Sequence, residues 1–215
     1  MVPLIKICGI KKYNDVKAAE ESGAFWYGLV FHKKSPRYIN LYHAEKIIKK
    51  FNTAIFPVAV TVNPDEGFIK NLVDIGIKNI QLHGCETLDN CLFLKDKFNI
   101  KVFKGIGLET EKDIELASEY SKIVDWIVFD KKDTVMYGGT GKSFNWNILS
   151  KVDININYMI SGGLTYKNVL NAINITKAKG VDVSSGVEKS PGNKSEDLIE
   201  KFCNSVKLFQ GEEIC

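Results

Sequence analysis

The sequence predicts a single-domain α/β protein, a (β/α)8 TIM barrel that occupies residues 1–215. Short apolar runs alternate along the chain with segments of helical periodicity. No low-complexity linker or long block of like charge divides the 215 residues, and a barrel of this kind needs nearly all of that length. Glycine clusters follow the last predicted strands, and this fold often binds phosphate in the loops after strands seven and eight.

The predicted strands are short apolar runs, often β-branched, that end at turns containing Gly, Asn or Pro. In chain order they are Leu4–Cys8, Trp26–Phe31, Ile55–Val62, Asn79–His83, Lys101–Ile106, Asp125–Asp130, Asn157–Ser161 and Val181–Ser184. Because these runs are apolar on more than one face, we expect a parallel sheet buried by helices.

The predicted helices lie between these strands and show apolar residues at helical spacing. They are Asn14–Ser22, Ala44–Phe51, Glu66–Ile75, Thr87–Phe98, Glu111–Ser121, Thr165–Ile173 and Ser195–Phe209. Strands that alternate with helices are typical of repeated βαβ units.

A doubly wound open sheet is the alternative architecture. Such a sheet places a glycine-rich turn directly after its first strand, whereas Ile7-Cys8-Gly9-Ile10 lacks the G-x-G-x-x-G pattern. The glycines cluster instead at Gly138–Gly141, at Gly162-Gly163 and at Ser184-Ser185-Gly186. This distribution favours the closed barrel.

Composition and charge exclude several classes of function. The net charge is only +3 and no basic stripe is interleaved with aromatics, so we expect no nucleic-acid partner. The longest apolar run, Ala54–Val62, is too short to span a membrane, and Lys6 interrupts the apolar N-terminus, so we expect no signal peptide. Five cysteines without metal-ligand spacing indicate a cytoplasmic protein with no disulfide framework and no structural metal.

One arginine, Arg37, stands among 29 basic residues that are otherwise lysine. A mutational bias toward AT-rich codons explains the scarcity of arginine but not the presence of this one. Pro36 stiffens the loop before it, and the planar guanidinium fork suits a carboxylate or phosphate better than an ammonium group does. We therefore expect Arg37 to contact an anionic ligand rather than to be a surface residue.

Polar or reactive side chains recur at the carboxyl ends of the predicted strands. They are Cys8, Asn63, Gln81, His83, Asp130, Ser161 and Ser184, with Arg37 just beyond a strand end. Strand ends converge at one mouth of a barrel, so a thiolate base at Cys8 and a carboxylic acid at Asp130 can together move a proton between carbons. A buried core cysteine and a loop-capping carboxylate are the alternatives for the two residues.

Gly162 and Gly163 suit a phosphate site, because backbone N–H groups can approach the anion where side chains are missing. A helix that starts at Thr165 would add its positive N-terminal end. The alternative for the glycine pair is a tight strand-to-helix turn.

Taken together, these motifs resemble the phosphoribosylanthranilate isomerase family. The matching segments, in order, are Lys6-Ile7-Cys8-Gly9, Ser35-Pro36-Arg37, Gln81-Leu82-His83-Gly84, Asp130, Gly138-Gly139-Thr140-Gly141 with Phe144 and Trp146, Ser161-Gly162-Gly163-Leu164 with Asn168, and Gly180–Glu188 followed by Pro191-Gly192. Each segment alone is weak, but their common order makes the set specific.

The resemblance implies an Amadori rearrangement of N-(5-phosphoribosyl)anthranilate without metal or organic cofactor. Asp130 is then the general acid that opens the ribose ring, and Cys8 is the general base that removes the C2 proton. Arg37 pairs with the anthranilate carboxylate. The remaining site residues are backbone amides for the phosphate at Gly162, Gly163, Ser185 and Gly186, and pocket-lining side chains at Gln81, His83 and Asp182. We expect a phosphorylated small-molecule substrate and a monomer or homodimer.

Three positions depart from the family pattern: Phe25, Thr61 and Ser195. The first two bear on local packing or substrate contacts, whereas Ser195 can cap the last helix as Asp does. Cys8 needs a nearby positive charge to act as a base, but Lys6 is expected one layer deeper in the barrel and not to serve as that helper.

Other interpretations stay open at this stage. Another phosphate-binding barrel, such as indole-glycerol phosphate synthase or a histidine-pathway sugar isomerase, is the main competitor. The synthase family uses a lysine acid and a glutamate at strand ends, where this chain has Cys8 and Asp130. A non-catalytic barrel that binds an anionic ligand is the third interpretation.

Overall fold

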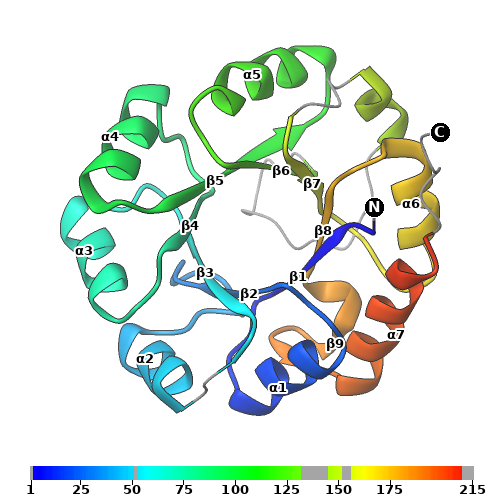
Figure 1. Ribbon diagram of the computed structural model, residues 1–215, viewed down its shortest axis with the longest axis horizontal. Coiled ribbons are helices and arrows are strands. Elements are labelled where there is room, and N and C mark those ends of the chain that lie inside the picture. Colours follow the sequence, from blue (N-terminus) through cyan, green and yellow to red (C-terminus); the bar gives the residue numbers. More distant parts are fainter. Residues whose placement is uncertain (1, 51–52, 132–144, 152–155, 210–215) are drawn as a thin grey trace.

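The computed structural model describes residues 2–50, 53–131, 145–151 and 156–209, and within these the parallel strands β1 to β8 form one closed barrel (Figure 1). The strands are β1 (Leu4–Cys8), β2 (Trp26–Val30), β3 (Phe56–Thr61), β4 (Asn79–Leu82), β5 (Lys101–Leu108), β6 (Trp126–Lys131), β7 (Tyr158–Ile160) and β8 (Gly180–Val183). Parallel pairing of β1 with β8, from Leu4 opposite Gly180 to Ile7 opposite Val183, closes the ring. The predicted barrel is therefore confirmed, and the open sheet is excluded.

A ring of helices surrounds the barrel (Figure 1). They are α1 (Tyr13–Glu21), α2 (Leu41–Lys50), α3 (Glu66–Asp74), α4 (Leu88–Phe98), α5 (Glu111–Ser121), α6 (Val169–Thr176) and α7 (Glu196–Lys207). Side-chain oxygens of Asp65 and Thr87 cap the N-termini of α3 and α4 by accepting backbone N–H groups. Among the described residues, no helix is both long and apolar enough to cross a membrane.

Shorter elements lie between the last strands. The 3₁₀ helix η1 (Trp146–Lys151) lies between β6 and β7, and η2 (Ser185–Val187) follows β8. After η2, β9 (Glu188–Ser190) and β10 (Asn193–Lys194) form a two-stranded antiparallel hairpin that the sequence patterns did not predict. The predicted glycine cluster Gly138–Gly141 and Phe144 lie outside the described residues.

Helix α6 begins at Val169, so the prediction of a helix start at Thr165 is wrong. The Asn168 side chain accepts the N–H of Thr165 at 2.8 Å and donates to the carbonyl of Gly163 at 2.9 Å. Asparagine competes with the helical backbone in this way, and here it holds a turn before the helix. The loop after β7 is consequently longer than the apolar pattern indicated.

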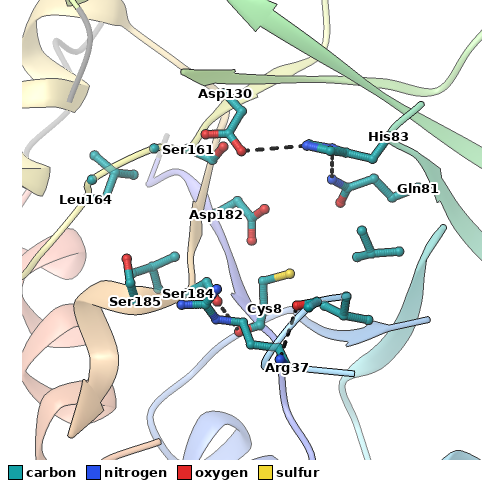
Figure 2. A pocket seen from close by; sticks show the side chains of 16 residues that line it. Cys8, Arg37, Gln81, His83, Asp130, Ser161, Leu164, Asp182, Ser184 and Ser185 are labelled. Atoms are coloured by element: carbon teal, nitrogen blue, oxygen red, sulfur yellow. Dashed lines mark hydrogen bonds and ion pairs between the residues drawn. The ribbon is translucent and has the colours of Figure 1, made fainter. Parts of the chain in front are cut away.

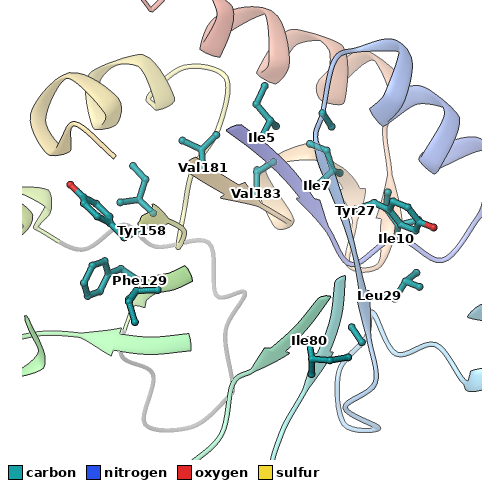
Figure 3. Close-up of a cluster of buried hydrophobic side chains, with 14 of the residues drawn as sticks. Ile5, Ile7, Ile10, Tyr27, Leu29, Ile80, Phe129, Tyr158, Val181 and Val183 are labelled. Carbon is teal, nitrogen blue, oxygen red and sulfur yellow. The ribbon is translucent and has the colours of Figure 1, made fainter. Parts of the chain in front are cut away.

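The barrel interior is packed in layers, whereas a larger cluster of buried side chains fills the space between strands and helices (Figure 3). The deepest interior layer, at the amino ends of the strands, contains Trp26, Val58, Phe103, Val128 and Met159. A smaller layer at the opposite end contains Cys8, Val30 and Val60. Because side chains alternate along each strand, the inward positions near the carboxyl ends are left for polar groups.

The three departures from the family pattern are each accommodated locally. Phe25 packs edge-on against Trp26, with 4.5 Å between ring centroids, at the amino end of the barrel. Thr61 is buried and donates its hydroxyl to the Gln81 carbonyl of the neighbouring strand at 3.3 Å. Ser195 accepts the N–H of Leu198 and caps α7, which confirms its expected role.

Candidate active site

A pocket at the carboxyl mouth of the barrel brings together nearly all of the predicted site residues (Figure 2). Its lining consists of Cys8, Val30, Ser35, Arg37, Val60, Gln81, His83, Asp130, Ser161, Gly162, Gly163, Leu164, Asp182, Val183, Ser184 and Ser185. Gly186 is the one predicted site residue that is missing from this lining, and it directly follows Ser185 in η2. Figure 2 shows Cys8 and Arg37 on one side of the pocket, Asp130 with His83 on the other, and Asp182 between them.

The thiol of Cys8 occupies space that a glycine provides. Cys8 ends β1 and lies opposite Gly28 of β2 in the strand register. A Cβ atom added to Gly28 would lie 2.7 Å from the Cys8 Sγ, closer than real side chains pack. Gly28 is therefore part of the site, although the sequence patterns did not single it out.

Burial raises the pKa of the Cys8 thiol, although Lys6 and Lys194 act in the opposite direction and favour the thiolate. The thiol is only 8% exposed, so desolvation is the larger effect. Cys8 therefore has an environment in which the charged form is costly but supported by nearby cations.

A buried ion pair lies beside Cys8. The ammonium group of Lys6 donates to Asp182 Oδ2 at 2.8 Å, and Lys6 itself is fully buried. Burial alone would lower the pKa of Lys6, but the neighbouring Asp182 and Cys8 outweigh this effect and raise it. Lys6 is not among the residues that line the pocket, which agrees with its expected position one layer deeper, but its positive charge still favours the thiolate of Cys8.

Asp130 lies beside the imidazole of His83, on the side of the pocket opposite Cys8. Its Oδ2 lies 3.7 Å from His83 Nε2, while the other ring nitrogen of His83 lies 3.0 Å from the Gln81 amide nitrogen. Because an amide NH₂ group only donates, His83 Nδ1 accepts and the proton of the neutral ring is assigned to Nε2, directed at Asp130. Gln81 thus sets the tautomer that His83 presents to Asp130.

Burial moves the pKa values of this pair in opposite directions. It raises the pKa of Asp130, against the opposing influence of His83, and it lowers the pKa of His83, against the influence of Asp130. A neutral imidazole beside a protonated carboxyl group is favoured by both shifts. A carboxyl group whose pKa is raised by burial is suited to act as a general acid.

Two glycine-containing loops form the end of the pocket where the phosphate is expected. Gly162 and Gly163 both have positive φ angles, of 76° and 71°, which favour glycine. The carbonyl of Leu164 occupies the place that a side chain on Gly186 would need, so the loops after β7 and β8 pack directly together. Amide groups in such loops form concave anion sites.

Arg37 is held by Glu188, which Lys194 also contacts, and the sequence analysis did not single out either of these two as a site residue. Its Nε and Nη2 donate to the two carboxylate oxygens of Glu188, each at 2.8 Å. Lys194 donates to the same carboxylate at 2.9 Å and also to the Ser184 carbonyl at 2.9 Å. Lys194 reaches the mouth because the β9–β10 hairpin folds back, a feature that apolar periodicity does not report.

The cluster of Arg37, Glu188 and Lys194 carries two positive charges and one negative charge. Burial would raise the pKa of Glu188, but its two cationic partners outweigh this and lower it. The wall of the pocket beside Cys8 therefore keeps a net positive charge, which suits an anionic ligand. Within the described part of the chain, no group of three or more His, Cys, Asp or Glu side chains is arranged to hold a metal ion.

The closed barrel, with its titratable groups gathered at the carboxyl mouth, defines a (β/α)8-barrel enzyme. The chain belongs to the N-(5'phosphoribosyl)anthranilate (PRA) isomerase family, whose family model matches residues 5–205. It is 37% identical over 211 residues to the N-(5'-phosphoribosyl)anthranilate isomerase of Bradyrhizobium diazoefficiens, covering 96% of this chain and 95% of that protein. The corresponding protein of Brucella canis is 39% identical over 206 residues, covering 94% and 93%.

Solved structures agree with this assignment. The phosphoribosyl anthranilate isomerase of Thermotoga maritima matches with a TM-score of 0.85 at 33% identity, covering 95% of this chain and 98% of that chain. A phosphoribosyl anthranilate isomerase in complex with reduced 1-(o-carboxyphenylamino)-1-deoxyribulose 5-phosphate matches with a TM-score of 0.82 at 32% identity and the same coverage. The family resemblance is therefore confirmed, and the protein is an isomerase rather than a synthase or a non-catalytic barrel.

Proposed function

We propose that the protein catalyses the Amadori rearrangement of N-(5-phosphoribosyl)anthranilate to 1-(2-carboxyphenylamino)-1-deoxyribulose 5-phosphate, a step of tryptophan biosynthesis. The observation that carries this proposal is the placement of Cys8 and Asp130 on opposite sides of one pocket in a chain of this family. A relative solved with a reduced form of that product supports the substrate class. The reaction needs only proton transfers, so no cofactor is part of the proposal.

Asp130 acts first, as the general acid. It gives its proton to the ribose ring oxygen while the bond between that oxygen and C1 breaks. The lone pair on the anthranilate nitrogen forms the double bond of a Schiff base at C1, which balances the charge. The raised pKa of buried Asp130 supports this role, because the residue must hold a proton before the step begins.

Cys8 acts second, as the general base. Its thiolate takes the proton from C2 of the sugar, and the C–H electron pair forms the carbon–carbon double bond of an enolamine. The enolamine then tautomerises: C1 gains a proton, the C2 hydroxyl loses one, and the ketone results. Substrate and product are isomers, so no proton or electron is left over.

Binding is proposed to use both ends of the pocket. Arg37 faces the anthranilate carboxylate with the part of its guanidinium fork that Glu188 does not occupy. Backbone amides at Gly162, Gly163, Ser185 and Gly186 hold the phosphate, a role supported by their place in two loops that pack together. Gln81, His83 and Asp182 line the space between these anchors.

We further infer that residues 1–215 work as one domain, as a monomer or a homodimer. One matching structure is described as monomers of a dimeric enzyme from Thermotoga maritima, so both states occur among forms of that relative.

Turnover of the fluorescent anthranilate substrate by the purified protein tests the proposal. Cys8→Ser and Asp130→Asn should each lower kcat by about 10²-fold or more, while circular dichroism shows an intact fold. Absence of turnover by the folded, unmodified protein contradicts the function. Full activity of Cys8→Ser contradicts the assignment of the base.

A further inference from the structure

Lys6 occupies an unusual position for a lysine, in the centre of the barrel. It lies two residues before Cys8 on β1, and residues at this spacing point to the same side of a strand. The side chain is fully buried, and its ammonium group bonds to Asp182 on the adjacent strand β8 at 2.8 Å. Lys6 and Asp182 are direct register partners in the sheet, so the backbone fixes their separation.

Packing alone does not account for this arrangement. Replacing a buried ion pair by apolar residues of similar volume is often neutral or stabilising, so a buried pair is weak evidence of a stabilising role. The layer beneath is formed by aromatic and aliphatic side chains, and a further apolar residue at position 6 would suit that surrounding. A fully buried lysine next to the thiol therefore calls for a chemical explanation.

We propose that Lys6 is a positioning residue for Cys8, whose ammonium group stabilises the thiolate that takes the C2 proton. This inference rests on the proposed function, because only a proton-abstracting thiol needs such support. The role of Asp182 is to pair with Lys6: its carboxylate keeps the ammonium group charged while Cys8 is a neutral thiol. The positive charge is thus present before the reaction and needs no rearrangement during it.

The other charged groups that face Cys8 do not replace Lys6. Lys194 of β10 favours the thiolate as well, but its ammonium group is bonded to Glu188 and to the carbonyl and hydroxyl of Ser184. Asp182 opposes the thiolate by like charge. Lys6 lies on the same strand and the same face as Cys8, two residues away, whereas Lys194 lies on the hairpin after β8.

The test measures ionisation of Cys8 directly, without turnover. The rate of alkylation by iodoacetamide is followed against pH in a Cys85→Ser background, because Cys85 is an exposed thiol, and mass spectrometry locates the label on Cys8. Lys6→Met keeps the length of the side chain and removes the charge. We expect alkylation of Cys8 at a pH below its midpoint to slow by about tenfold or more, since one pKa unit is a tenfold change in thiolate.

Two further variants separate this electrostatic effect from a loss of structure. Lys6→Arg keeps a positive charge at this position, so alkylation of Cys8 should stay close to that of the unmodified protein. Lys104→Met removes another buried lysine, whose ammonium group is bonded to Glu86 at 2.9 Å and to the carbonyls of Leu82 and Gly84. It should leave the alkylation profile of Cys8 unchanged.

Slower alkylation in Lys6→Met together with a nearly unchanged rate in Lys6→Arg supports the proposal. An unchanged profile in folded Lys6→Met overturns it, as does a tenfold slower alkylation in Lys6→Arg, which also decides the matter if Lys6→Met does not fold. The proposed function is tested separately. It depends on turnover by the unmodified protein, whereas the alkylation profile is measured without substrate.

Discussion

Arg37 and Glu188, 151 residues apart in the sequence, form a two-point ion pair in the wall of the pocket. Both bonds measure 2.8 Å, and the arginine side chain is 9% exposed. The planar fork is therefore fixed in orientation before any ligand arrives. The single arginine of the chain is located where two parallel hydrogen bonds to a carboxylate are needed, and a lysine cannot make both.

Arg37→Lys is expected to weaken substrate binding and the fold together. Lysine keeps the charge but loses the two-point contact with Glu188 and the remaining fork nitrogen that we propose for binding the substrate carboxylate. We expect KM to rise about tenfold or more and the free energy of unfolding to fall by about 1–3 kcal/mol. Steady-state kinetics and urea unfolding measure the two effects.

Glu188→Gln is the matched control for that change. It disturbs the same ion pair from the other side and leaves the arginine in place, so stability should fall while KM changes less. If KM rises equally in both variants, the direct contact between Arg37 and the substrate is contradicted, and Arg37 is a structural residue.

Asp130→Asn is expected to remove activity and to stabilise the protein at neutral pH. The folded-state pKa of Asp130 is raised from its ordinary 3.8, so the stability this group contributes is present at lower pH and is lost as pH rises through the raised pKa. Asparagine does not ionise and escapes that loss. The free energy of unfolding at pH 7 should therefore be higher than in the unmodified protein.

Urea unfolding between pH 4 and pH 8 measures this difference. The advantage of Asp130→Asn should grow with pH and then level off once the unmodified carboxyl group is ionised. If the difference in free energy of unfolding between the two proteins is the same at every pH, the raised pKa of Asp130 is contradicted, because a raised pKa makes that difference depend on pH.

Gly28→Ala is expected to impair both catalysis and stability through one methyl group. That group would lie 2.7 Å from the Cys8 Sγ and 3.0 Å from its Cα, and the backbone atom cannot move aside. Overpacking of this kind costs about 1–3 kcal/mol, and displacement of the base should lower kcat by about tenfold or more. Thermal unfolding and kinetics provide the measurements.

Gly67→Ala provides the comparison. Gly67 lies in the first turn of α3, is exposed, and an added Cβ meets Asp65 Oδ1 at an acceptable 3.4 Å. This substitution should leave kcat unchanged and should stabilise the protein by about 0.5–1 kcal/mol. Equal effects of the two substitutions would show that the room beside Cys8 is not required.

The barrel and most of the pocket could be predicted from sequence, because both follow from local patterns. Strand after strand ends in a polar residue, as with Cys8 and Asp130, and closure of the barrel alone brings these ends together. The start of α6 was misplaced because one side chain, Asn168, bonds to the backbone on both sides of the turn. Apolar spacing contains no signal for such a contact.

The charged partners were harder to find for a different reason. The pairing of Lys6 with Asp182 depends on the register between the first and last strands, which no local pattern specifies. Lys194 is brought to the pocket by a short hairpin of polar residues, without the alternation that marks a strand. Both lysines resemble ordinary surface residues until their neighbours are known.

Glu86→Gln is expected to destabilise the protein strongly while leaving Cys8 unaffected. Glu86 is 5% exposed, and its carboxylate accepts N–H groups of Asn63 and Gly84 as well as the ammonium group of Lys104. A glutamine can satisfy the backbone donors only by turning its NH₂ group toward Lys104, which leaves a buried ammonium without its anion. Breaking a buried pair in this way costs about 3–5 kcal/mol.

The double variant with Lys104→Met tests the origin of that cost. Once the ammonium group is gone, the glutamine NH₂ no longer faces a buried cation, so the double variant should be more stable than the sum of the two single changes implies. Urea unfolding of all four proteins measures this coupling. Additive losses would contradict the ion pair as their cause and would point to the backbone contacts of Glu86 with the loop that follows β4.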